Sequence, residues 1–281
     1  MAARDPVPLV LLVLAGYNAL ELLIYLGDIF TRRNGLYFWS ITVSIIALVG
    51  YTIIGILGYC RAASPAAVQV GSILTVSVVT TAHAFTMYSR LRLFLRPQSA
   101  TGIGNLLVLP WVLWLIITTT FASLLPEIVV IIRIYISGYE YSHGGVEHII
   151  ESVCFTIYCA REVIICSIYI LQGLRQLQPI AQAKGAAGKR VIVQLILVQA
   201  IAILLDLLLL LHIYLSIGEA RISPLLKGSM ATLVYALQIK MEFFILNRLV
   251  VLLEAPITAF SLLPGENDVL DISPAVNGRN P

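Results

Sequence analysis

Residues 191–217 read VIVQLILVQAIAILLDLLLLLHIYLSI, and Asp206 is the only charged side chain among them. A helix of this length spans about 40 Å, which is more than the hydrocarbon core of a bilayer. Six further stretches have the same apolar character, at residues 6–30, 36–59, 67–95, 106–135, 147–177 and 225–253. The sequence therefore predicts an all-α, polytopic membrane protein with seven transmembrane helices within residues 1–253.

The composition supports this class and excludes several others. Of the 281 residues, 59% are hydrophobic and 12% are charged, whereas soluble domains carry about 25% charged residues. A net charge of +3 is too small and too scattered to indicate a nucleic-acid partner. The four cysteines lack metal-ligand spacing and no phosphate-binding motif is present, so we expect no metal and no cofactor.

Basic residues predict the orientation of the helices, because cytoplasmic loops are rich in Lys and Arg. Alternate connections carry ten basic residues, against three on the opposite side. The ten are Arg32, Arg33, Arg90, Arg92, Arg96, Arg175, Lys184, Lys189, Arg190 and Arg248, and the three are Arg4, Arg61 and Arg221. We therefore expect an outer or lumenal N-terminus and a cytoplasmic C-terminus, with residues 254–281 forming a disordered cytoplasmic tail.

Ionisable side chains inside apolar spans are costly to insert and are often functional. Four such acids, at 21, 162, 206 and 242, are expected to lie between the midplane and the cytoplasmic side and to converge on one interior cavity. The first of them shares a helix face with Asn18, Tyr25 and Asp28. The candidate catalytic residues are Glu162, Asp206, Glu242 and Glu21, and the candidate substrate-binding residues are Tyr25, His83, Tyr158, Tyr169, Tyr235 and Gln238.

The charges at this depth do not balance. The four acids outnumber the permanent cations, Arg161 and Lys240, by two. At least one carboxyl group is therefore expected to be neutral and able to donate a proton. A structural alternative stays open, in which Arg161 with Asp206, or Lys240 with Glu21, simply joins two helices. Arg90 and Arg92 are expected to extend to lipid headgroups.

Two well-known classes with seven spans fit the sequence poorly. In a G-protein-coupled receptor an acid would precede Arg90 and an Asn-Pro-x-x-Tyr motif would close the last span, and neither is present. In a microbial rhodopsin an aspartate would stand four residues before Lys240, where this chain has Ala236.

Residues 15–252 resemble a large fungal family of seven-span integral membrane proteins. The resemblance is carried by NALELL at 18–23, GLYFWS at 35–40, YSRLRL at 88–93, residues 161–175, Asp206 with its leucine run, LKGS at 226–229 and QIKMEFFIL at 238–246. Arg161 departs from the family pattern, in which a less charged residue precedes the glutamate. Most members of this family have no assigned function, so the resemblance implies topology rather than chemistry.

In size, span number and buried acids the chain is also similar to fungal membrane-bound terpene cyclases of meroterpenoid pathways, of the ascochlorin and ascofuranone type. This similarity implies a hydrophobic, prenylated substrate that is cyclised when a carboxylic acid protonates an epoxide or alkene, in the endoplasmic reticulum. The alternative is a receptor or sensor without catalytic activity in the plasma membrane. The short connection at 178–190, which has no bulky insert for a protein partner, favours the enzyme.

Overall fold

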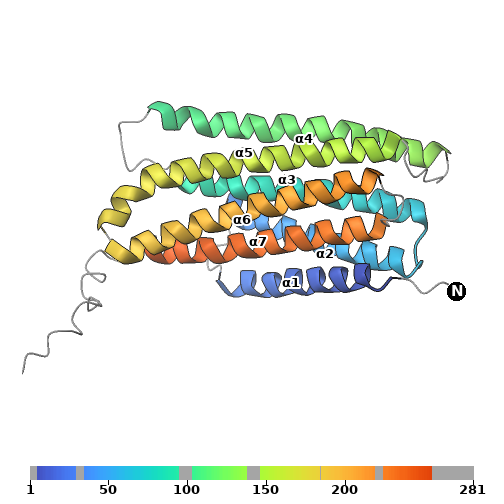
Figure 1. The fold of residues 1–281 in the computed structure, drawn as a ribbon, viewed down its shortest axis with the longest axis horizontal. Helices are drawn as coiled ribbons and strands as arrows, with labels where there is room; N and C mark the ends of the chain where they lie inside the picture. The colour runs from blue at the N-terminus through green and yellow to red at the C-terminus, as the bar shows by residue number, and fades with distance from the viewer. Residues whose placement is uncertain are drawn as a thin grey trace, which may run out of the picture.

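The computed structural model describes residues 5–29, 35–94, 103–137, 146–183, 185–218 and 224–254. Helices make up nearly all of this part of the chain, and none of its residues lies in a strand (Figure 1). The seven helices are α1 (Val7–Ile29), α2 (Leu36–Tyr59), α3 (Pro65–Phe94), α4 (Ile103–Ser137), α5 (Val146–Ala183), α6 (Gly185–Gly218) and α7 (Pro224–Glu254). The predicted all-α class is thereby confirmed.

Six of the seven predicted spans are confirmed as helices long and apolar enough to cross a membrane, and these are α1 to α6. The exception is α7. Its described side chains include Lys227, Lys240 and Glu242, which lower the hydropathy of the helix. Each of these charges has a partner of opposite sign on another helix, respectively Glu151, Glu21 and Arg90. The charges that make α7 less apolar than the other six helices are therefore neutralised by side chains of neighbouring helices.

The helix boundaries differ from the predicted ones mainly between α5 and α6. The prediction placed a break from Pro179 to Lys189, whereas α5 continues to Ala183 and α6 starts at Gly185. Four alanines between 181 and 187 explain the difference, because alanine has the highest helix propensity. Several predicted features lie outside the described residues: Arg32, Arg33, Arg96, Lys184, residues 139–143, the tail from 255 and the side chain of Asp28.

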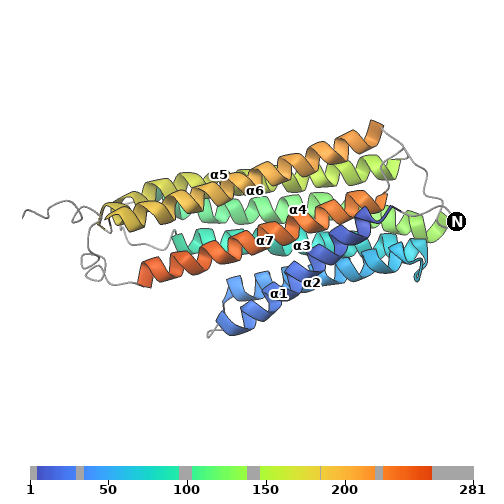
Figure 2. The same ribbon diagram turned by 60° about the horizontal axis from the view of Figure 1, so that its bottom comes forward.

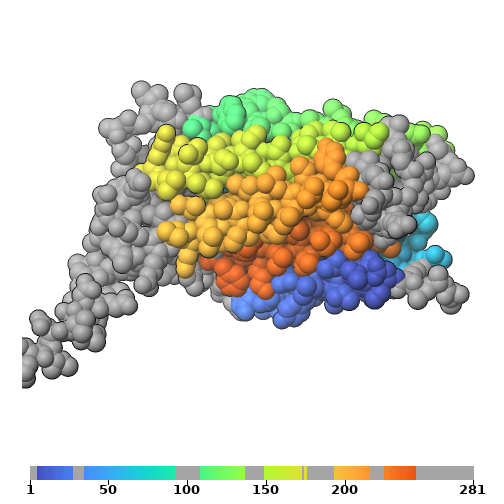
Figure 3. Space-filling model, in the orientation of Figure 1, coloured from blue at the N-terminus to red at the C-terminus, as the bar shows by residue number. Residues whose placement is uncertain are grey.

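The helices form a closed ring in chain order. Each helix contacts the next one along the chain, and α7 closes the ring against α1. Two further contacts, α2 with α7 and α3 with α5, cross the middle of the bundle. Figure 2 shows α7 running diagonally across α3, with α1 and α2 below it, and on the face drawn in Figure 3 the surface of α7 is a band between α6 and α1. This central position explains how α7 can place charged side chains in the interior.

Two apolar clusters fill the bundle. One includes Leu22, Ile41, Val234 and Phe243, and it joins α1, α2 and α7. The other includes Leu91, Ile116, Ile165 and Leu195, and it joins α3, α4, α5 and α6. The outer surfaces of the helices are also apolar, as expected for contact with lipid tails: Ile24 and Trp114 are about two-thirds exposed.

Small residues allow α1 and α2 to approach closely. A Cβ atom added to Gly16 would lie 2.9 Å from the Cγ2 atom of Thr52, closer than real Cβ contacts come. Thr52 has little freedom to move away, because its hydroxyl donates to the carbonyl of Leu48 and its β-branched side chain is stiff. Gly27, on the same helix, has no neighbour within 4 Å of the corresponding position.

We expect Gly16→Leu to lower the stability of the bundle by about 1–3 kcal/mol, the usual cost of overpacking. Gly27→Leu is the matched control, because both variants gain helix propensity in α1 but only one meets a neighbour. The apparent Tm in detergent would measure the difference. Equal melting temperatures for the two variants would contradict the close contact between α1 and α2.

Candidate functional site

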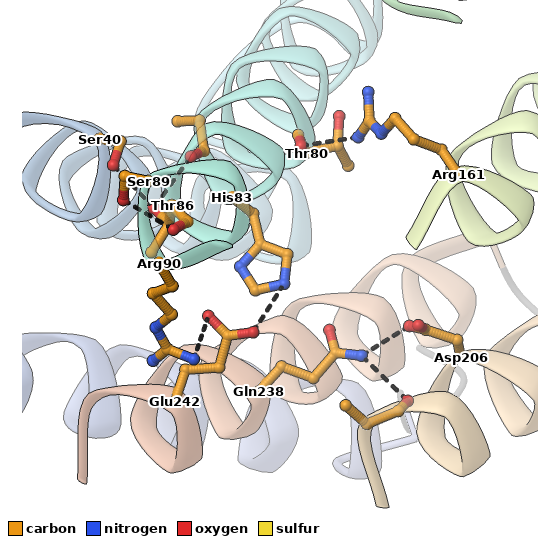
Figure 4. Close-up of polar contacts among 12 residues, drawn as sticks. Ser40, Thr80, His83, Thr86, Ser89, Arg90, Arg161, Asp206, Gln238 and Glu242 are labelled. Atoms are coloured by element: carbon orange, nitrogen blue, oxygen red, sulfur yellow. Dashed lines mark hydrogen bonds and ion pairs between the residues drawn. The ribbon is translucent and has the colours of Figure 1, made fainter. Parts of the chain in front are cut away.

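An ion pair between α3 and α7 lies in the centre of the bundle (Figure 4). An Nη atom of Arg90 is 3.7 Å from one carboxylate oxygen of Glu242, and Nε2 of His83 is 3.8 Å from the other. The Arg90 guanidinium also lies over the ring of Tyr37, 5.7 Å from its centroid. Only about 1% of Arg90 is exposed. The prediction that Arg90 extends to lipid headgroups is therefore wrong, because Glu242 gives it a partner inside the protein.

A second polar group joins α5, α6 and α7. The Gln238 side-chain amide donates to Oδ1 of Asp206 over 2.6 Å and to the carbonyl of Ala202 over 3.3 Å (Figure 4). The carboxyl group of Glu162 is buried close to that of Asp206, and one oxygen atom of each has no hydrogen-bond partner. Two carboxyl groups can hydrogen-bond to each other only when one of them carries a proton. A hydrogen bond between Glu162 and Asp206, here called the carboxyl pair, would therefore require one shared proton.

No described residue forms an ion pair with Glu162 or Asp206. Arg161, beside Glu162 in the chain, donates instead to the carbonyl of Thr80 over 2.7 Å and more weakly to the hydroxyl of Thr120. Its guanidinium lies over the ring of Tyr158, 5.3 Å from the centroid. Arg161 thus joins α5 to α3 and α4.

Helix α1 places fewer polar side chains in the interior of the bundle than predicted. Glu21 does not reach the carboxyl pair, because its carboxylate is 2.7 Å from Nζ of Lys240 and both side chains are about one-quarter exposed. The same ammonium group donates to Asn18 over 2.9 Å. Tyr25 is 39% exposed and its ring lies edge-on to Phe244. The polar face of α1 therefore meets the edge of α7, and the expected single convergence of all four acids is wrong for Glu21.

The other predicted site residues are buried in the bundle. Tyr158, Tyr169 and Tyr235 are each at most 3% exposed. Tyr235 lies edge-on to His83, with their ring centroids 6.5 Å apart. The structure therefore brings His83, Tyr235 and Gln238 together with Asp206 and Glu242, while Tyr158 turns toward α4.

Glu127 of α4 belongs to a further polar group that the predicted site did not include. It accepts a short hydrogen bond from the hydroxyl of Ser77, and a second one, over 2.9 Å, from the hydroxyl of Tyr158. Its position just after Pro126 in an apolar helix was the available sequence signal. The partner hydroxyls could not be found that way, because Ser77 is 50 residues away in the chain.

Comparison with protein families gives one match. The model described as "Domain of unknown function (DUF7703)" matches residues 3–258. The chain belongs to this family. Comparison with curated proteins and with solved structures gave no match. The match covers all seven helices of this DUF7703 protein, so the ion pair, the carboxyl pair and Glu127 all lie within the family domain.

We expect Arg90→Met to destabilise the protein by about 3–5 kcal/mol, because it leaves Glu242 as a buried charge without its cation. The double variant Arg90→Met with Glu242→Met removes both charges and should recover most of that loss. Thermal unfolding in detergent measures both. Glu21→Met, at the one-quarter-exposed pair with Lys240, is the control and should cost about 1 kcal/mol or less. A double variant less stable than Arg90→Met alone would contradict direct coupling between the two residues.

Proposed function

We propose that this protein is a seven-span membrane enzyme that cyclises a prenylated, membrane-dissolved substrate in secondary-metabolite biosynthesis, without a metal or a cofactor. In this proposal α7 crosses the membrane with the six apolar helices, the N-terminus is lumenal and the C-terminus is cytoplasmic. The compartment that suits such a substrate is the endoplasmic reticulum.

The observation that supports the proposal is the Glu162–Asp206 pair. Both residues are about 1% exposed, each has a carboxyl oxygen atom without a hydrogen-bond partner, and no described cation forms an ion pair with either. Protonation of an epoxide or alkene needs a neutral acid in a water-poor site, held next to a group that takes the negative charge. A carboxyl pair held by Gln238 supplies both.

The proposed reaction is an isomerisation in which the protein gains and loses one proton. The acid of the pair transfers its proton to the epoxide oxygen, and the carbon–oxygen bond breaks. A double bond of the chain then attacks the carbon that becomes positive, which closes a ring. The conjugate carboxylate, or the ionised Glu242 beside it, takes a proton from the final cation and restores the starting charge. The rings of Tyr169 and Tyr235 stabilise the cation, whereas the ring of Tyr158 is covered by Arg161 and takes no part.

A receptor or sensor function is the second candidate, and the contact of Glu242 with both Arg90 and His83 favours it. This contact links α3 to α7 through groups whose charges decide whether the two helices attract. A ligand or a proton that weakened the contact would release α7 from α3. In that case the carboxyl pair serves only to join helices, and its neutral variants keep the function if they fold.

We expect at least one of Glu162→Gln and Asp206→Asn to abolish the cyclic product while the linear precursor persists. These substitutions keep size and hydrogen bonding but remove the transferable proton, and loss of a general acid typically costs about 10²–10⁴-fold in rate. Each variant would be expressed in a host that supplies a prenylated phenol and its epoxide, with products followed by mass spectrometry. Glu242→Gln tests the proposed ionised partner, and Glu21→Gln is the control remote from the pair.

The enzyme proposal fails if both pair variants fold and still cyclise at the wild-type rate, or if the wild type converts no prenylated phenol or epoxide. Protein yield and the size-exclusion profile separate loss of chemistry from loss of folding.

The proposed orientation can be tested with a native residue. Cys60, just after α2, is exposed, whereas Cys154, Cys159 and Cys166 are buried. We expect a membrane-impermeant maleimide to label Cys60 from the lumenal or outer side. In Cys60→Ser with Gly35→Cys, at the other end of α2, labelling should appear only on the cytoplasmic side. The reverse pattern would invert the topology.

A further inference from the structure

A groove of about 490 Å³ opens on the outer surface of α2, α3 and α4. Its base is a stripe of α3 with helical spacing, made of Leu74, Ser77, Val78, Thr81, Ala82 and Phe85. Its walls are Leu36, Trp39, Ser40 and Val43 of α2 and Leu124 of α4. The volume falls in the range of small-molecule sites, about 300–1,000 Å³, and the opening faces the lipid phase.

The two serines of the groove differ in what lies behind them. Ser40, at the end near Phe85, donates to the carbonyl of Tyr37 and accepts from Thr86. Ser77, at the end near Leu124, donates to Glu127. That carboxylate has no ion-pair partner among the described residues, and Glu127 keeps 9% of its surface exposed. Only this end of the groove therefore has a buried carboxylate behind its wall.

The donors and acceptors at the Ser77 end of the groove indicate which kind of ligand it can bind. Glu127 lies behind the lining of the groove and accepts from the hydroxyls of Ser77 and Tyr158, so Ser77 is the polar group that a ligand meets at this end. The hydroxyl of Ser77 has used its only proton and can still accept. Ser77 thus offers no donor, and the carboxylate behind it repels anions such as phosphate or a fatty-acid carboxylate. From Ser77 to Phe85 the groove continues along α3 for about 12 Å, at about 1.5 Å per residue, with apolar walls.

We propose that this groove binds a single-chain lipid alcohol, with its hydroxyl group donating to Ser77, in front of Glu127, and its chain along α3 toward Phe85. A hydroxyl supplies the missing donor, and an apolar chain matches the walls. This site is distinct from the Glu162–Asp206 pair, and binding there does not depend on cyclisation. Tyr158 connects the two regions, because it donates to Glu127 while its ring lies under Arg161.

The test uses the full chain in phosphatidylcholine nanodiscs and a photoreactive diazirine analogue of farnesol. Peptides of α2, α3 and α4 that line the groove should be labelled, and the labelled peptides can be mapped by mass spectrometry. The methyl ether of the same probe lacks the donor and should bind up to about tenfold more weakly, because a hydrogen bond between neutral groups contributes about 0.5–1.5 kcal/mol. This comparison needs no variant, so misfolding cannot affect it.

Variants locate the site. Val78→Trp fills the groove and should remove the labelling, whereas Leu204→Trp, on the exposed face of α6, should not. Ser77→Ala should reduce binding of the farnesol probe up to about tenfold and leave the ether unaffected. Its control is Ser167→Ala, because the hydroxyl of Ser167 is exposed and bonds only to its own helix.

The proposal is overturned if the alcohol and the ether label equally, or if labelling survives Val78→Trp. It is also overturned if diazirine-labelled phosphatidylcholine labels the same peptides and farnesol does not compete with it, since the groove then holds ordinary lipid. Because the assay measures binding alone, an inactive enzyme with a labelled groove would leave this proposal standing.

Discussion

The bundle depends on pairing each charge that it takes out of water. In a low-dielectric interior an isolated ion costs several kcal/mol, so a buried Arg or Glu is tolerated only with a partner. Glu242 illustrates the constraint, because it lies between Arg90 and His83 in the centre of the bundle. The polar helix α7 can therefore occupy the middle of an otherwise apolar assembly, and its contacts with α1, α2 and α6 close the ring.

Because buried charges need partners, the buried carboxyl groups that lack an ion-pair partner are the candidates for a functional role. Arg90 and Lys240 each neutralise one acid, and Arg161 is used on a backbone carbonyl. Glu162, Asp206 and Glu127 have no ion-pair partner among the described residues. The enzyme proposal rests on a proton that the carboxyl pair would transfer, and the binding proposal rests on the acceptor groups of Ser77 and Glu127 beside the groove.

The two regions differ in their access from the membrane. The carboxyl pair lies deep between α5, α6 and α7, whereas Glu127 lies behind the wall of a groove that opens to lipid. Tyr158 and Arg161 bridge the distance between them. A molecule dissolved in the bilayer would therefore meet Glu127 first, and changes at α4 have a direct path of contacts to α5.

The sequence by itself determined the helices and the polarity of their faces. Hydrophobic length and helical spacing are local properties, so the spans, the buried faces of α5, α6 and α7, and the outward turn of Lys240 were all predictable from residues close in the chain. The tertiary structure decided which charges meet. Arg90 of α3 forms an ion pair with Glu242 of α7, which is far away in the chain. Glu21 forms an ion pair with Lys240 at the partly exposed contact of α1 with α7. Ser77 donates to Glu127, which is 50 residues away in the chain. These choices depend on how each helix is rotated and which helix lies beside it, and the packing of the whole ring sets both.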